Sequence, residues 1–139
     1  MQSGTGLARK LSPNELSHEI IRAALKVHTA LGPGLLESAY QTCLAYELRE
    51  MGFRVETEVP LPVVYKGVQL DCGYRLDLVV EDLVVVELKS IDAPVHKAQM
   101  ISYLKLSGKS LGLLINFNVT HLREGIKRFV EGKSWNKKS

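Results

Sequence analysis

Hydrophobic residues recur with a helical period near the start of the chain. Leu16, Ile20, Ala24, Val27 and Leu31 are spaced three or four apart, which predicts a helix with one buried face. The residues before it, Ser12-Pro13-Asn14-Glu15, form a capping box, and Gly32-Pro33-Gly34 ends the helix. The same period over residues 36–51 predicts a second helix, which Gly52 ends.

The pattern then changes to alternating or continuous apolar runs, which are typical of strands. These predict strands at Phe53 to Glu58 and Val63 to Tyr65, followed by a turn at Lys66-Gly67, and an antiparallel hairpin made of Gly73 to Val80 and Leu83 to Lys89. A nearly continuous apolar run, Leu111 to Phe117, predicts a strand covered on both faces.

Two further helices are predicted around that last strand. One opens at Asp92-Ala93-Pro94 and closes at Gly108, and the other is capped by Thr120 and places Leu122, Ile126, Phe129 and Val130 along one side. The order ααβββαβα predicts an α/β fold in which helices flank a mixed β-sheet.

The composition of 139 residues, 45% hydrophobic and 24% charged, is that of one soluble globular domain. We expect a flexible N-terminal segment over 1–11, the domain over 12–131 and a basic flexible tail over 132–139. A chain of this size has no room for a separate cofactor domain, so no organic cofactor is expected. No secretory or membrane-spanning stretch is evident, and Cys43 and Cys72 lack metal-ligand spacing, which favours a cytoplasmic protein without structural zinc.

Charge adds one uneven feature. The net charge is +3, but from Arg123 onward six basic residues face two acidic ones. This end is either a solubilising tail or a surface that attracts phosphates.

The candidate chemistry lies in the predicted hairpin, where Asp77, Glu87 and Lys89 interrupt apolar strands. Glu87 and Lys89 are two apart and share a face of the strand. A tight two-residue turn at Glu81-Asp82 would turn Asp77 away from Glu87. We therefore predict a loop or bulge that shifts the register by one residue and brings the two carboxylates together.

Two converging carboxylates suit Mg²⁺ or Mn²⁺, hard ions that take oxygen ligands and act on phosphodiesters. Lys89 would then stabilise developing negative charge. The alternative is an ion pair of Lys89 with Asp77 or Glu87 that only supports the fold, and spacing alone does not separate the two readings.

Four segments in order resemble a known family. Gly34-Leu-Leu-Glu37-Ser-Ala-Tyr40 is similar to the motif that names the GxxExxY proteins, a bacterial branch of the PD-(D/E)XK nuclease superfamily. GYRLDLVVEDLVVVELKS, HKAQMISYLK and LGLLINF also resemble that pattern. The resemblance implies a restriction-endonuclease-like core and a Mg²⁺- or Mn²⁺-dependent nuclease, although Leu76 stands where the motif's opening proline is expected.

The resemblance also implies roles for individual residues. Glu37, Asp77, Glu87 and the backbone carbonyl of Leu88 would bind the metal, and Asp77, Glu87, Lys89 and Gln99 would be the catalytic set. Tyr40, Arg75, His96 and Tyr103 are candidates for nucleic-acid contact. From the residues alone, Tyr40 also fits a core aromatic, Glu37 a helix N-terminal acid, and the stripe His96, Gln99 and Tyr103 a solvated helix face.

The implied partner is nucleic acid, with DNA favoured over RNA. Two other readings stay open. The first is an inactive nucleic-acid- or protein-binding module that retains the nuclease fold, and the second is a structural domain that forms a homodimer through its apolar strands or first helix.

Overall fold

The structure is a computed structural model that describes residues 10–91 and 97–131. Two helices come first, α1 (Pro13–Leu31) and α2 (Glu37–Glu50). The Ser12 side chain accepts a hydrogen bond from the Glu15 amide at 3.1 Å, and the Glu15 carboxylate accepts one from the Ser12 amide at 2.9 Å. The predicted capping box is therefore confirmed, and both predicted helices are present.

The centre of the molecule is a five-stranded sheet with the strand order β2-β5-β6-β7-β8. Its members are β2 (Val55–Pro60), β5 (Arg75–Val80), β6 (Val84–Lys89), β7 (Leu111–Asn116) and β8 (Ile126–Val130). Strands β6 and β7 run parallel, while the other neighbouring pairs are antiparallel. The predicted mixed sheet, with the β5–β6 hairpin at its middle, is confirmed.

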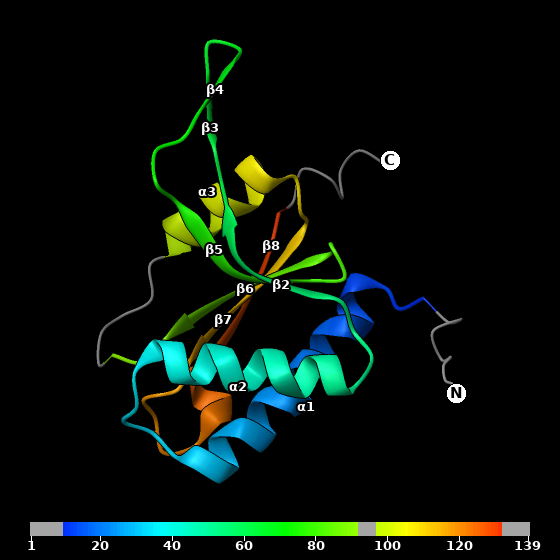
Figure 1. Ribbon diagram of the computed structural model, residues 1–139, viewed down its shortest axis with the longest axis vertical. Helices are drawn as coiled ribbons and strands as arrows, with labels where there is room; N and C mark the ends of the chain where they lie inside the picture. Colours follow the sequence, from blue (N-terminus) through cyan, green and yellow to red (C-terminus); the bar gives the residue numbers. More distant parts are fainter. Residues whose placement is uncertain (1–9, 92–96, 132–139) are drawn as a thin grey trace.

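Helices cover both faces of this sheet (Figure 1). Helices α1 and α2 pack on one face, where Leu78, Val80, Val86 and Leu113 join their apolar side chains in one core cluster. Helix α3 (Lys97–Ser107) packs on the other face through Met100 and Leu104. The apolar mass of the chain is thus divided into two layers of core, one on each side of the sheet.

One predicted helix is wrong. Residues after Thr120 form a short 3-10 helix, η2 (Leu122–Gly125), and then the edge strand β8. The spacing of Ile126 and Phe129 fits a helical stripe, but on a strand it places the two side chains on opposite faces, where each joins a different core cluster. Strand β8 pairs antiparallel with the outer edge of β7. The backbone hydrogen bonds of this pairing override the helical pattern of the sequence.

The structure contains one strand that was not predicted, and two of the predicted features lie wholly or mostly outside the described residues. A second small sheet pairs β3 (Val63–Tyr65) with β4 (Val68–Leu70) around the predicted turn at Lys66-Gly67, and β4 was not expected. The predicted opening of the third helix at Asp92-Ala93-Pro94 lies outside the described residues. So do nearly all of the predicted terminal segments, although Leu11 packs against the core.

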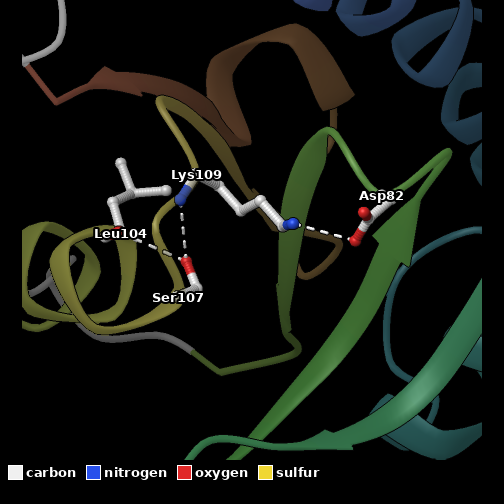
Figure 2. A network of polar contacts seen from close by, with 4 residues as sticks. All are labelled: Asp82, Leu104, Ser107 and Lys109. Atoms are coloured by element: carbon white, nitrogen blue, oxygen red, sulfur yellow. Dashed lines mark hydrogen bonds and ion pairs between the residues drawn. The ribbon is translucent and has the colours of Figure 1, made fainter.

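A polar network closes the end of the hairpin that carries its turn (Figure 2). Lys109, between α3 and β7, donates a hydrogen bond to Asp82 at 2.8 Å, and its amide donates to the Ser107 hydroxyl at 3.3 Å. The Ser107 hydroxyl in turn donates to the Leu104 carbonyl at 3.2 Å. The α3–β7 connection is thus held to the turn end of the hairpin, away from the carboxylates.

Candidate metal and nucleic-acid site

The two faces of strand β6 carry different chemistry. Val84, Val86 and Leu88 point into the core formed by α1 and α2, whereas Val85 points into the core under α3. Side chains alternate along a strand, so Glu87 and Lys89 lie on the α3 side. The predicted shared face is confirmed.

The register of the hairpin brings Asp77 to the same place. Val80 pairs with Val84, which leaves Leu83 as an extra residue after the turn. Both central turn residues, Glu81 and Asp82, have positive φ values, 52° and 56°. The shift of one residue predicted from the sequence is therefore present, and it sets Asp77 opposite Glu87.

Side chains replace the backbone ladder where the carboxylates meet. The Asp77 amide donates to Oε2 of Glu87 at 3.0 Å, and the Leu88 amide donates to Oδ2 of Asp77 at 2.7 Å. Regular pairing of β5 with β6 stops at Leu78 opposite Val86. These two bonds hold both carboxyl groups in fixed positions between the strands.

The same break exposes a backbone oxygen. The amide of Leu88 faces Asp77, and the N–H and C=O of one strand residue point to the same side. The Leu88 carbonyl therefore also faces the gap between β5 and β6, beyond the last paired residues. Two carboxylates and one carbonyl converge on one small region.

Strand β2 is also distorted beside Asp77. Glu58, which would be the pairing partner of Asp77, has a positive φ of 52°, and the β2–β5 pairing skips this position. On β5, Leu76 packs into the core under α3 while Leu78 packs into the opposite core, although they are two residues apart. The alternation of β5 thus changes at Asp77, which sits in a local break of the sheet on both sides.

Burial shifts the acid–base behaviour of the pair. Glu87 is only 7% exposed, and its burial, followed by the charge of Asp77, raises the pKa of Glu87 to about 8. Burial also raises the pKa of Asp77, against the bond from Leu88, and the charges of Glu37 and Glu58 add to the increase. A cation bound between these two poorly solvated carboxyl groups would therefore favour their ionised forms.

Lys89 does not neutralise them directly. Its side chain is half-buried, and its charge lowers the pKa of both carboxyl groups. Among the residues that the structure describes, it forms no ion pair within 4.0 Å of Asp77 or Glu87. The ion-pair alternative is thus not what these residues form.

Glu37 reaches the site through the turn that follows strand β6. Its Oε2 accepts a hydrogen bond from the Ser90 amide at 3.3 Å, and the Ser90 hydroxyl donates to the Leu35 carbonyl at 2.6 Å. Glu37 is exposed and close enough to raise the pKa of Asp77 and Glu87. Within residues 10–91 and 97–131, however, no group of three or more His, Cys, Asp or Glu side chains is arranged to hold a metal ion.

Tyr40 is not placed to contact nucleic acid. It is 0% exposed and stacks on Phe117, with ring centroids 4.3 Å apart. Its hydroxyl donates to the Gly32 carbonyl at 2.5 Å and accepts from the Leu35 amide at 3.1 Å. Tyr40 is the core aromatic of the alternative interpretation, and it fixes the loop that leads to Glu37.

The other candidates lie on or near the α3 side of the sheet. Gln99 is exposed on α3, and Tyr103, one turn further, is half-buried against the core below. Arg75 is exposed and pairs with Asp71 at 3.5 Å rather than with Glu87. His96 lies outside the described residues.

Sequence reasoning missed three residues around the site: Glu58, Ser90 and Tyr74. Ser90 directly follows the E-x-K residues, which could have marked it as the link to Glu37. A positive φ at a glutamate leaves no readable signal, because glycine or asparagine is the usual residue there. Tyr74 precedes β5 and contacts Tyr103 edge-on, with ring centroids 6.0 Å apart. That contact follows from the packing of α3 and cannot be read from the sequence.

The donor set can be tested against a divalent cation. Mg²⁺ in enzymes is typically held by one or two carboxylates, with water and substrate oxygens completing its shell. Asp77 and Glu87 each keep a second oxygen to which no described residue hydrogen-bonds, and the Leu88 carbonyl faces the same gap. The residues therefore fit a hard divalent ion held by two carboxylates, with Glu37 outside the inner set.

Comparison with known proteins agrees with this geometry. No curated protein and no solved structure matches the chain. The family model of the PD-(D/E)XK nuclease superfamily matches residues 14–129, which include both carboxylates, Lys89 and all strands of the central sheet except the last residue of β8. Nucleases of this superfamily generally use divalent metals and act on nucleic acid. With its mixed sheet flanked by helices and its paired carboxylates on adjacent strands, the chain belongs to the PD-(D/E)XK nuclease superfamily.

Proposed function

We propose that the protein is a metal-dependent nuclease that hydrolyses phosphodiester bonds. The observation that carries this proposal is the pair of Asp77 and Glu87, which are half-buried and buried between two strands and held there by hydrogen bonds. Among the described residues, no lysine forms an ion pair with either carboxyl group. Keeping such a pair in a fold costs stability, which is understandable when the pair serves a ligand.

Asp77, Glu87 and the Leu88 carbonyl would hold Mg²⁺ or Mn²⁺. When bound, the ion supplies Lewis acidity and offsets the negative charge of the reacting phosphate. Lys89, on the same face as Glu87, orients the phosphate and stabilises the charge that develops on its oxygens. Gln99 assists from α3, and Glu37 adds negative potential from the N-terminus of α2.

The first test measures cleavage by the purified full chain. Labelled DNA and RNA, single- and double-stranded, are incubated with Mg²⁺, with Mn²⁺ or with EDTA. We expect cleavage of at least one substrate in the presence of metal and none in EDTA. Replacing Lys89→Ala should lower the rate about 10²–10³-fold, the usual effect of removing one preorganised charge stabiliser.

The matched control is Lys26→Ala, which removes an exposed lysine from helix α1, on the opposite face of the sheet, and should leave the rate unchanged. Equal rates for the wild type and Lys89→Ala would identify a contaminating nuclease and contradict the proposal. Salt-sensitive binding of nucleic acid without any cleavage would favour the inactive binding module instead.

A further inference from the structure

An aromatic pair flanks the carboxylates on the α3 side. Tyr74 lies just before β5, and Tyr103 lies on α3; their ring centroids are 6.0 Å apart and their planes are inclined at 61°. Tyr103 packs against the core under α3, while Tyr74 is 45% exposed. A large part of the Tyr74 ring therefore stays open to a flat ligand.

The pair is close to the proposed reaction centre. Tyr74 is three residues before Asp77 on the same segment. The charges of Glu87 and Asp77 reach Tyr103, where they add to burial in raising the pKa of its hydroxyl. Tyr103 packs against the core under α3, on the side to which Glu87 and Lys89 point, and Tyr74 contacts it from the segment that leads into Asp77.

The Tyr74 backbone is held in place. Its carbonyl accepts a hydrogen bond from the Leu61 amide at 2.9 Å and another from the Arg75 guanidinium at 2.9 Å. Tyr103 is fixed by the packing of α3. The backbone that carries Tyr74 is therefore held in place before any ligand binds, and a ligand that stacks on the ring loses little freedom to loop ordering.

We infer that Tyr74, backed by Tyr103, stacks an unpaired base next to the phosphodiester that would be cleaved beside Asp77 and Glu87. This inference rests on the proposed nuclease function and names its substrate class: single-stranded nucleic acid, or a strand with unpaired bases. A base in a duplex has both faces covered by its neighbours, whereas an unpaired base can leave the stack and lie on an aromatic side chain.

The test measures binding separately from cleavage. Glu87→Gln protein in EDTA is titrated with a short single strand that carries 2-aminopurine, and with the matching duplex. Stacking on a ring quenches the fluorescence of 2-aminopurine, a signal that a purely structural tyrosine would not give. We expect tighter binding of the single strand, with quenching at the position next to the site.

Adding Tyr74→Ala should weaken single-strand binding about 5- to 150-fold and remove the quenching, whereas Tyr74→Phe should retain both. The control is Tyr46→Ala on α2, which removes a tyrosine that is 61% exposed and lies on the helix layer across the sheet. Thermal unfolding of each variant verifies that it is folded.

Equal single-strand binding by Tyr74→Ala and Tyr46→Ala, or duplex binding as tight as single-strand binding, would overturn the inference. Cleavage with Mg²⁺, measured without the Glu87 substitution, distinguishes the two proposals. Duplex cut equally by wild type and Tyr74→Ala leaves the nuclease standing without the base site. Stacking that depends on Tyr74, with no cleavage by any variant, leaves the base site standing and contradicts the nuclease.

Discussion

Among the site residues, Glu87 loses the most stability through the burial of its carboxyl group. It is buried on a strand whose other core-facing residues are valine and leucine, and one of its oxygens accepts the Asp77 amide. That single bond does not replace the water that a carboxylate loses on burial. The protonated form is therefore favoured in the metal-free fold, and stability depends on pH.

The sign of that dependence follows from the pKa of Glu87, which rises from its ordinary 4.5 to about 8 on folding. Below pH 4.5 the group is neutral in both states. Between these two values the unfolded chain loses its proton while the folded chain retains it, so the free energy of unfolding decreases as pH rises, and it levels off above pH 8.

Glu87→Gln should remove this contribution, which is on the order of 5 kcal/mol at its largest. Urea unfolding of the metal-free protein from pH 4 to 9 measures it. The exposed Glu56→Gln on β2 is the control and should follow the wild type. An identical pH profile for wild type and Glu87→Gln would contradict the assignment.

The sequence was most informative at this scale. Charges inside an apolar hairpin identified Asp77, Glu87 and Lys89, because a strand rarely buries such groups without a purpose. The buried position of Tyr40 could not be predicted in the same way. Its spacing from Glu37 fits both a site and a core, and only the stacking on Phe117 decides between them.

At the scale of elements, two breaks in regular pairing hold the site. One is the extra residue Leu83 in the β5–β6 hairpin, and the other is the left-handed Glu58 on β2. The first was predictable, because the two carboxylates share a face only after a shift of one residue. The second was not, since it arises where β2 meets the altered alternation of β5.

The strain at Glu58 can be measured. Glu58→Gly should raise the free energy of unfolding by about 1 kcal/mol, because glycine adopts positive φ without the clash of a Cβ atom. Glu58→Gln retains the strained backbone and removes only the charge that raises the pKa of Asp77. Denaturant unfolding of the two variants at one pH separates strain from charge.

If both variants shift stability equally, the charge rather than the backbone is responsible, and the proposed strain is wrong.

Strand β8 shows a related limit of sequence patterns. The spacing of Ile126 and Phe129 fits a helix, but the backbone pairing of this segment with β7 makes it a strand. Edge strands are defined by their partners more than by their own residues.

For the whole molecule, metal binding and stability should be linked. A ligand that binds only the folded state raises the unfolding temperature, and a metal must displace the proton that Glu87 holds. Mg²⁺ or Mn²⁺ should therefore stabilise the protein more at pH 9 than at pH 6. At a concentration of about 100 times Kd the gain is about 2.7 kcal/mol.

Thermal unfolding with and without metal, at both pH values, measures this linkage. Each kcal/mol should raise Tm by roughly 4 °C for a domain of this size. Asp77→Asn should lose the stabilisation at both pH values, and Lys26→Ala on α1 should keep it. A shift of the same size at pH 6 and pH 9 in the wild type would mean that the metal binds away from Glu87.

The local nature of the β5–β6 hairpin also has a consequence for how the protein folds. The bonds between Asp77 and its partners join residues only 10 and 11 apart in the chain, whereas pairing of β6 with β7 joins Val84 to Leu111 across α3. Short loops close at a lower entropic cost than long ones. We therefore expect the carboxylate pair to come together early in folding, before the parallel crossover is complete, so that the two acids stay in contact with water until α3 packs over them and lose that water only in the last stage of folding.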